Sequence, residues 1–392
     1  MNVRRIALWT LFWLAAVNCR APLVATGPLL PLIRRDLHLS ATVGGTLTAI
    51  PLLVMALLSI PGGLVVDRFG PRTAMVAGQL AIAFAGGIRG LVPHPTVYLV
   101  AVALLGGAIG ISQPALARLS NAMAPTPASV ATSIYANGFV MGGLFASLLS
   151  ATAFLQWVGP YSWRGVLGLW AILGLAVGLG WILMRPSSAA RPAGAPRSPA
   201  GWWTALSLPG VLPIGLVFAS QSAIFYGLVT WIPSYYVGLG WSVGAASWPN
   251  TVLSLASIPG ALITPSLIQR WGNRTTAIFF GAVTLIGVLG FWLLPALGVL
   301  WAIFPGLGTA GGLTLGLAAA PDLAPPDRVG VVAGALLAIG YLGAVPGALV
   351  VGNLRDLTGS FAWGLAYLAA IGLIFVGAGR AIPDRGAGVA SA

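Results

Sequence analysis

One arginine stands in the middle of the first long apolar stretch of the chain. Arg20 comes 15 residues after Arg5 and 14 residues before Arg34, and in a helix each gap is about 21–23 Å. In a bilayer, a charge at that depth costs about 2.5–3.5 kcal/mol even on lenient scales, and its side chain cannot reach either surface. Because a guanidinium binds carboxylates and other small oxyanions through its planar fork, Arg20 predicts an anion-binding centre. The alternatives are bonding to carbonyls and amides of neighbouring helices, or a span that is placed wrongly.

Other polar and aromatic side chains in apolar stretches are candidates for the same site. Asn18 lies two residues before Arg20, roughly 200° around a helix, so it does not share the face of Arg20. Gln113 and Asn137 also lie in apolar stretches, where an amide more often bonds between helices than binds a ligand. The second half adds Gln221, Ser222, Phe225, Tyr226 and Tyr341. The first four of these recur at helical spacing and can form one face, although aromatic stripes more often serve packing than binding.

The composition indicates which elements must position these residues. Hydrophobic residues make up 58% of the 392 residues and charged residues only 6%, whereas a soluble chain carries about 25% charged residues. We therefore expect a lipid bilayer as the surroundings, in which a helical span needs about 20 mainly apolar residues. The sequence predicts an all-α membrane protein with twelve transmembrane helices in two six-helix bundles. The expected spans are residues 6–30, 41–64, 73–91, 96–117, 128–154, 165–184, 207–232, 243–268, 275–295, 298–320, 328–352 and 362–380.

A segment rich in Pro, Ala and Ser separates the two sets of six spans. Residues 185–203 include three arginines, and we expect them to form a cytoplasmic linker between bundles at 1–184 and 204–392. With the N-terminus in the cytoplasm, 13 arginines fall inside and five fall outside, which are Arg34, Arg35, Arg89, Arg164 and Arg355. This bias predicts an inner-membrane protein with both termini in the cytoplasm. A cleaved signal peptide is rejected, because the apolar pattern continues past any cleavage point.

The inventory of reactive side chains excludes several classes of protein. The net charge of +13 is carried by arginines spread singly and in pairs between apolar stretches, which fits membrane topology and does not indicate a nucleic-acid partner. One cysteine and two histidines without ligand spacing predict no metal site and no cofactor. Hydrolysis inside the membrane would need a paired base or metal ligands, and a sensor would normally carry a soluble domain. We therefore expect neither an enzyme nor a sensor.

Two short motifs occur twice in the chain, in the same order. Residues 59–62 read SIPG, as do residues 257–260. The turn RFGPRT at 68–73 is matched by RWGNRT at 270–275, and each turn lies between the second and third expected spans of its half. The repetition predicts a duplicated chain, a plan on which transporters place their substrate site between the halves near the bilayer midplane.

The first of these turns resembles a family signature. Residues 63–72, GLVVDRFGPR, resemble the signature of the major facilitator superfamily: Gly, three residues, Asp, Arg, any residue, Gly and then basic residues. Pro71 departs from it, standing where a basic residue is usual. Gly70 allows a tight turn, and Asp67 can form charge-assisted bonds with the arginines that latch one access state. The resemblance implies a gating motif of Gly63, Asp67, Arg68, Gly70 and Arg72, with Arg270, Gly272 and Arg274 in the second half.

A narrower resemblance runs along nearly the whole chain. Short segments resemble the cyanate permease and 2-nitroimidazole transporter branch of that superfamily. They are NCRAP at 18–22, GPLLP at 27–31, QS at 221–222, FYG at 225–227, WIP at 231–233, GYLG at 340–343 and RDLTG at 355–359. The resemblance implies a monomer that carries a small anion or a small polar heterocycle.

Two functions remain open at this stage. The first is a secondary transporter that moves a cyanate-like, nitrate-like or organic carboxylate anion by alternating access, with Arg20 as its central charge. The alternative is an efflux carrier for small neutral or cationic drugs such as nitroimidazoles. Residues 135–143 lack the Gly-Pro motif of drug–proton antiporters, and Arg20 would repel cations, so the first is favoured. No acidic residue lies well inside an expected span, which argues against a built-in carboxylate proton relay and leaves uniport, exchange and symport open.

Overall fold

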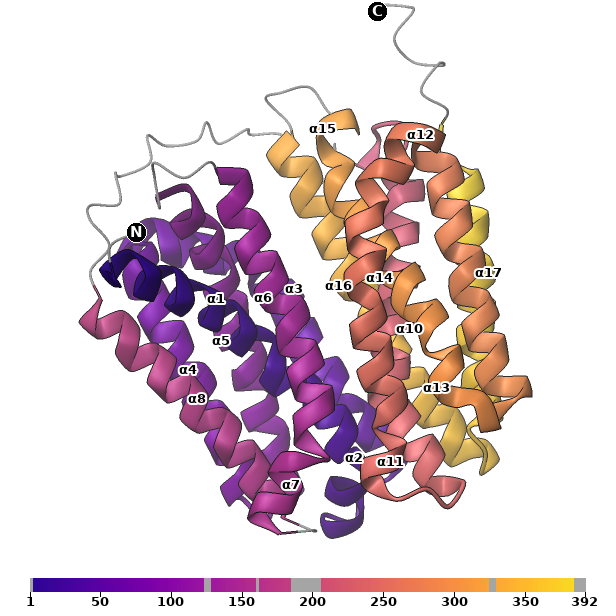
Figure 1. Ribbon diagram of the computed structural model, residues 1–392, viewed down its shortest axis with the longest axis horizontal. Coiled ribbons are helices and arrows are strands. Elements are labelled where there is room, and N and C mark those ends of the chain that lie inside the picture. The colour runs from indigo at the N-terminus through magenta and orange to yellow at the C-terminus, as the bar shows by residue number, and fades with distance from the viewer. Residues whose placement is uncertain (1–2, 123–127, 160–161, 185–205, 324–328, 384–392) are drawn as a thin grey trace, which may run out of the picture. The chain divides into compact units, whose positions relative to one another are not determined.

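The computed structural model describes residues 3–122, 128–159, 162–184, 206–323 and 329–383. At a few of these positions, Asp67 among them, only the backbone is described. Every regular element of the described residues is a helix (Figure 1), and the predicted linker at 185–203 lies outside them. The chain divides into two compact units, residues 1–193 with 233–247, and residues 194–232 with 248–392. The bundle boundaries at 184 and 204 stay a prediction.

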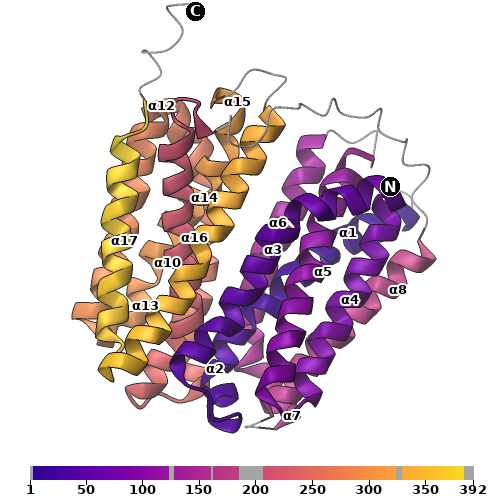
Figure 2. The same cartoon turned by 180° about the vertical axis from the view of Figure 1, so that it is seen from behind.

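The first unit is a bundle of long helices (Figure 1). Its elements are α1 (Val3–Val24), α2 (Thr26–Asp36), α3 (Ala41–Phe69), α4 (Pro71–Leu91), α5 (Pro95–Ala122), α6 (Ala128–Ser150), α7 (Ala153–Val158), α8 (Trp163–Leu183) and α11 (Val243–Ala246). Four pairs form its main packing: α4 with α8, α3 with α5, α4 with α5, and α1 with α6. Figure 2 shows α4 and α8 side by side along their length.

The second unit is built in the same way. Its elements are α10 (Val211–Gly238, up to residue 232), α12 (Trp248–Leu293), η1 (Pro295–Leu297), α13 (Gly298–Trp301), α14 (Ile303–Ala318), α15 (Ala320–Leu323), α16 (Val329–Thr358) and α17 (Ala362–Arg380). The long α12 packs against both α14 and α17. It can do so because its backbone leaves the helical conformation at Gly272, where φ is 76° and ψ is 172°.

The helices accommodate twelve membrane spans. Among the described residues, nine segments are long and apolar enough to cross a membrane, and the bent pair Pro295–Trp301 and Ile303–Ala318 makes ten. One of the nine, Val243–Leu293, has 51 residues and contains the break at Gly272, so it holds two spans. The remaining span is α6, of which Ile134–Ser150 forms a shorter apolar helix.

Proline and glycine residues set the ends of the first helices. α1 ends at Val24 because Pro28 has no N–H to donate to that carbonyl and its ring crowds it. The first span continues through α2 to Asp36, so it is longer than the expected 6–30. Gly70 joins α3 to α4 with a φ of 84°, a conformation that side chains disfavour. Arg20 is thereby fixed in α1, within an unbroken helix.

The duplicated SIPG motifs occupy equivalent places in the two units. Gly62 of α3 lies so close to α5 that a Cβ there would be 2.5 Å from the carbonyl oxygen of Gly110. Gly260 of α12 approaches α14 equally closely, because a Cβ there would be 2.5 Å from the carbonyl oxygen of Leu307. Each motif therefore seats a close helix crossing, which supports the predicted duplication.

Large apolar side chains lie both inside the first unit and on its surface. Phe12 and Trp181 are fully buried, whereas Leu57, Phe84 and Leu183 are 63%, 66% and 83% exposed. A surface of this kind is rare on a protein in water. In a bilayer the exposed side chains contact lipid. The helices of this unit therefore carry apolar side chains both toward its interior and toward its surface.

Candidate functional site

Arg20 lies at the centre of the first membrane span. The span Arg4–Asp36 has 33 residues, and Arg20 is sixteen residues from each end. The side chain is half-buried and interacts with other groups of the chain. This position agrees with the depth that the spacing of arginines predicts.

Glycines of α6 pack closely against α1, the helix that carries Arg20. A Cβ at Gly142 would lie 3.0 Å from the Cβ of Arg20 and 2.5 Å from the carbonyl oxygen of Val17. A Cβ at Gly138, one turn earlier, would lie 2.8 Å from the carbonyl oxygen of Trp13. Small residues with this spacing allow two membrane helices to pack backbone against backbone. The α1–α6 crossing therefore fixes the position of the guanidinium stem.

Asn137 lies on the same helix pair as Arg20. Its Oδ1 accepts a hydrogen bond of 2.8 Å from Nε1 of Trp13, and Asn137 is exposed while Trp13 is half-buried. The ring of Phe145 meets the indole edge-to-face, with centroids 6.2 Å apart. Trp13 and Phe145 were not among the residues expected from the sequence. A tryptophan two turns before the central arginine on one helix is the signal that could have found Trp13.

Asn18 points away from Arg20, as their spacing predicts. It is fully buried, and its Nδ2 donates a hydrogen bond of 2.8 Å to Oε1 of Gln79 on α4. A Cβ at Gly174 of α8 would lie 3.0 Å from the same nitrogen. Asn18 thus joins three helices inside the first unit. Its role in substrate binding stays a prediction, as does that of Gln113, which is half-buried on α5.

The expected residues of the second half cluster on α10. Gln221, Ser222 and Tyr226 are each 4% exposed, and Nε2 of Gln221 donates a hydrogen bond of 2.7 Å to Oγ of Ser222. Phe225 is half-buried, and its ring centroid lies 5.2 Å from that of Tyr226. Tyr341 is half-buried on α16. Their contact with substrate stays a prediction.

The crossing of α10 with α16 repeats the crossing of α1 with α6. A Cβ at Gly347 would lie 2.0 Å from the carbonyl oxygen of Ala223, as a Cβ at Gly142 would crowd that of Val17. Tyr226 comes three residues after Ala223, as Arg20 comes three residues after Val17. When the two crossings are matched in this way, Tyr226 occupies the position in α10 that Arg20 occupies in α1. The duplication has therefore placed a phenol in one half where the other half has a guanidinium.

The first copy of the expected gating motif joins α3, α4 and α8. The Arg72 side chain donates hydrogen bonds to the carbonyl oxygens of Trp181, Ile182 and Met184, at 3.3, 2.7 and 3.3 Å. These carbonyls end α8, where a helix lacks backbone partners and favours positive charge. Arg68 is exposed and lies over the ring of Phe69. The side chain of Asp67 is outside the described part of the structure, so its bonds stay a prediction.

The second copy has the same backbone geometry. Gly272 adopts a φ of 76°, close to the 84° of Gly70, so both turns use glycine where side chains are disfavoured. Arg270 and Arg274 are exposed on the ends of the helices that the turn joins. In the first copy, a Cβ at Gly63 would meet nothing within 4 Å. The gating role of the residues of both copies stays a prediction.

Arg89 occupies a place that the sequence did not suggest. The sequence places Arg89 among the charges outside the membrane, yet the structure buries it completely at the end of α4. Its Nη2 donates to the carbonyl oxygen of Pro22 (3.1 Å) and its Nη1 to Oγ1 of Thr26 (3.3 Å). Arg89 therefore bonds to the chain on both sides of the break between α1 and α2.

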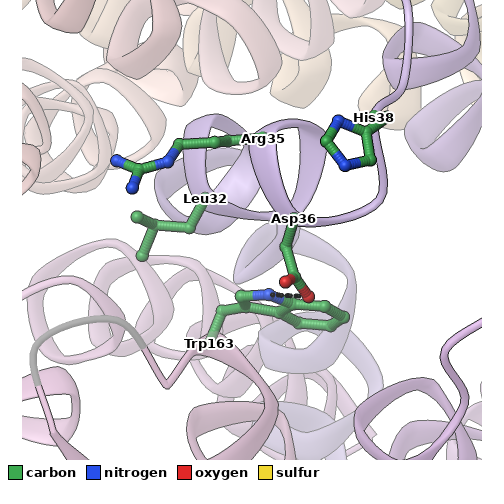
Figure 3. Close-up of a pocket in the computed structure, with 5 residues that line it drawn as sticks. All are labelled: Leu32, Arg35, Asp36, His38 and Trp163. Carbon is green, nitrogen blue, oxygen red and sulfur yellow. Dashed lines mark hydrogen bonds between the residues drawn. The ribbon is translucent and has the colours of Figure 1, made fainter.

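A pocket of about 240 Å³ lies at the end of the first span (Figure 3), and Arg20 is not among the residues that line it. It is lined by Leu32, Arg35, Asp36, His38 and Trp163. Asp36 accepts a hydrogen bond of 3.2 Å from Nε1 of Trp163 and forms an ion pair of 2.8 Å with Arg164. In the part of the chain that the structure describes, no group of three His, Cys, Asp or Glu side chains could hold a metal ion.

Comparisons with known proteins agree with this architecture. The sequence profile of the Major Facilitator Superfamily matches residues 8–348 and 239–388. The cyanate transport protein CynX of Escherichia coli K12 is 26% identical over 370 residues, covering 93% of this chain and 94% of the relative. The 2-nitroimidazole transporter of the same organism is 28% identical over 381 residues, covering 94% of this chain and 93% of the relative. Both matches confirm the resemblance expected from the short segments.

A solved structure with little sequence identity has the same fold. The crystal structure of the nucleoside transporter NupG superposes with a TM-score of 0.75 at 12% identity, covering 97% of this chain and 99% of that one. At this identity the likeness concerns the fold alone. Together with the profile match, it confirms the predicted fold class of twelve transmembrane helices in two bundles.

Proposed function

This chain belongs to the major facilitator superfamily of membrane transporters, and we propose that its substrate is a small anion. Arg20 is the central anion-binding charge, and the anion crosses the inner membrane by alternating access. The chain is a multi-pass transporter of a small molecule and not an enzyme, like the relatives that it matches along most of its length.

The depth of Arg20 is the observation that carries the proposal. A guanidinium sixteen residues from either end of its span cannot be solvated by water at the surface. It is half-buried, so part of it remains accessible to a ligand. The low dielectric of the surroundings strengthens its attraction for an anion and its repulsion of a cation. A carboxylate or another small oxyanion matches the donor geometry of the fork.

The surroundings of Arg20 support the same assignment. The close approach at Gly142 fixes the backbone and the Cβ of Arg20 against α6, so the origin of the side chain is held in place before the fork binds a ligand. Asp36 and Asp356 lie at the ends of their spans, far along the helix from the bilayer centre. Nothing acidic in the sequence of the described spans stands at the depth of Arg20.

The two relatives suggest different substrates. One is a cyanate transport protein and the other a 2-nitroimidazole transporter, and only cyanate is a permanent anion. The second candidate function is therefore efflux of a small neutral or cationic drug. The half-buried Phe225 beside Tyr226 on α10 favours it, because aromatic rings bind flat heterocycles.

Topology and assembly are part of the proposal. The excess of arginines on one side predicts both termini in the cytoplasm. Moving Arg89 from the outer loops to the protein interior leaves four outer arginines instead of five, so the bias becomes stronger. We propose a monomer in the inner membrane, with bundles at 1–184 and 204–392 joined by the segment 185–203.

A thermal-shift screen of the purified protein in detergent tests the proposal. The probes are cyanate, nitrate, acetate and benzoate, with 2-nitroimidazole and a cationic dye for the second candidate. A ligand at 100 times its Kd stabilises the folded state by about 2.7 kcal/mol. We expect an anion to raise the apparent Tm of the wild type and of Arg380→Ala, an exposed arginine on α17, but not of Arg20→Ala. Stabilisation by the dye or 2-nitroimidazole alone, unchanged in Arg20→Ala, would favour the efflux function instead.

A further inference from the structure

We propose that the anion bound by Arg20 is an aromatic carboxylate, whose ring packs against Trp13 and Phe145. This inference rests on the proposed function, since it takes Arg20 as the anion-binding charge. It adds a specificity-determining surface next to that charge and a substrate class that distinguishes this chain from a carrier of triatomic anions.

Trp13 shares the face of α1 that carries Arg20. The two residues are seven positions apart, which is close to two full turns, and both are half-buried. A face that presents a guanidinium at the centre of a bilayer does not face hydrocarbon, because the charge would be too costly there. The accessible part of the indole therefore opens onto the same polar space as Arg20.

Two contacts with α6 hold the indole of Trp13 in a fixed orientation. Its N–H is engaged by Oδ1 of Asn137 at 2.8 Å, and the ring of Phe145 meets it at 6.2 Å with an interplanar angle of 77°. With its donor engaged by Asn137, the indole presents mainly carbon atoms to a ligand. Such a surface attracts an aromatic ring and gains nothing from a small hydrated anion.

The spacing between the ring surface and the charge selects the size of the ligand. Two helical turns separate the Cα atoms of Trp13 and Arg20 by about 10 Å along the axis. A triatomic anion is too short to span a separation of two helical turns. A phenyl ring with a short carboxylate chain can contact both, since its carboxylate takes the fork of Arg20 while its ring packs edge-to-face or offset on Trp13.

Binding of 3-phenylpropionate, its saturated counterpart 3-cyclohexylpropionate and cyanate tests the inference. Affinities of the full chain in detergent are measured by titration calorimetry for the wild type, Trp13→Leu, Trp13→Phe and the control Trp9→Leu. Trp9 lies on the same helix one turn further from Arg20, about 16 Å along the axis, and its ring contacts Phe12. The apparent Tm without ligand is recorded for every variant.

We expect the wild type to bind 3-phenylpropionate about two- to twelvefold more tightly than 3-cyclohexylpropionate, which is the range of an aromatic pair. Trp13→Leu removes that preference and leaves any affinity for cyanate unchanged. Trp13→Phe retains part of the preference, because it keeps a ring but loses the bond to Asn137. Trp9→Leu binds all three anions like the wild type.

Three outcomes overturn the inference. Equal affinity of the wild type for the two propionates shows that no aromatic surface contacts the ring of the ligand. An unchanged preference in Trp13→Leu assigns the preference to another residue. An equal loss of every anion in Trp13→Leu, with a lowered Tm, makes Trp13 a packing residue. Failure of the proposed function looks different, because Arg20→Ala would then bind 3-phenylpropionate as the wild type does, whatever Trp13→Leu shows.

Discussion

Replacing Gly62 by alanine perturbs the closest approach between α3 and α5. The added Cβ would lie 2.5 Å from the carbonyl oxygen of Gly110 and 3.2 Å from its carbonyl carbon. Unstrained carbon contacts lie at about 3.5–4.0 Å, so the two helices must separate by about 1 Å. Because the neighbouring atoms belong to the backbone, no side chain can rotate away to relieve the contact.

The size of the effect follows from this geometry. Overpacking of this kind costs about 1–3 kcal/mol, of which the better helix propensity of alanine offsets up to about 1 kcal/mol. For a unit of this size, each kcal/mol shifts the Tm by about 2–4 °C. With a net cost of about 1–2 kcal/mol, we expect Gly62→Ala to lower the apparent Tm by about 2–8 °C, measured by intrinsic tryptophan fluorescence in detergent.

The adjacent glycine provides the control. A Cβ at Gly63 would meet nothing within 4 Å, so Gly63→Ala should leave the Tm unchanged or raise it slightly. Gly260→Ala should repeat the loss seen with Gly62→Ala, because its Cβ would also lie 2.5 Å from a carbonyl oxygen, that of Leu307. If Gly62→Ala and Gly63→Ala melted at the same temperature, the close crossing and the argument built on it would be refuted.

Four further substitutions test contacts elsewhere in the two units. Arg89→Ala should lower the Tm more than Arg164→Ala, because Arg89 is fully buried and donates a hydrogen bond to the carbonyl oxygen of Pro22. The ion pair of Arg164 is partly exposed and contributes only about 0–1 kcal/mol. Equal losses of Tm in the two variants would contradict this prediction. Arg72→Ala should increase hydrogen exchange in the last turn of α8, whose carbonyls it caps, and unchanged exchange would argue against the cap. Trp231→Phe should cost about 0.5–1.5 kcal/mol, since it removes a buried 2.7 Å bond to a carbonyl of α16; a neutral Tm would show that this bond contributes nothing.

Much of the fold could be predicted because its signals are local. Apolar length marks the spans, and the repeated SIPG motifs mark the duplication that the crossings at Gly62 and Gly260 support. Boundaries were less accurate where a span continues past a local break, as the first span does when it runs to Asp36 and not to residue 30. The expected spans 243–268 and 275–295 are two helices that meet at Gly272, the residue that leaves the helical conformation.

The candidate site could be predicted only in part. Arg20 stands out because a lone charge in an apolar stretch has few explanations. Its close contact with Gly142 could not be predicted, since the sequence does not say which helix crosses α1. Arg89 was assigned to the outside because it lies near the end of its span, where a loop residue and a buried one look alike. Gln79, the partner of Asn18, is a lone amide in an apolar span, and this is the signal by which the sequence points to it.

Transport into proteoliposomes tests the central claim about Arg20 most directly. Uptake of labelled cyanate, nitrate and benzoate is measured for the wild type, Arg20→Ala, Arg20→Lys and Arg380→Ala, with the apparent Tm of each as a check of folding. We predict saturable uptake of at least one anion by the wild type and Arg380→Ala, and none by a folded Arg20→Ala. Arg20→Lys should bind at least about tenfold more weakly, because a charge-assisted bond contributes about 1.5–3 kcal/mol and the fork is lost. Wild-type uptake of the same anion by Arg20→Ala would contradict the account.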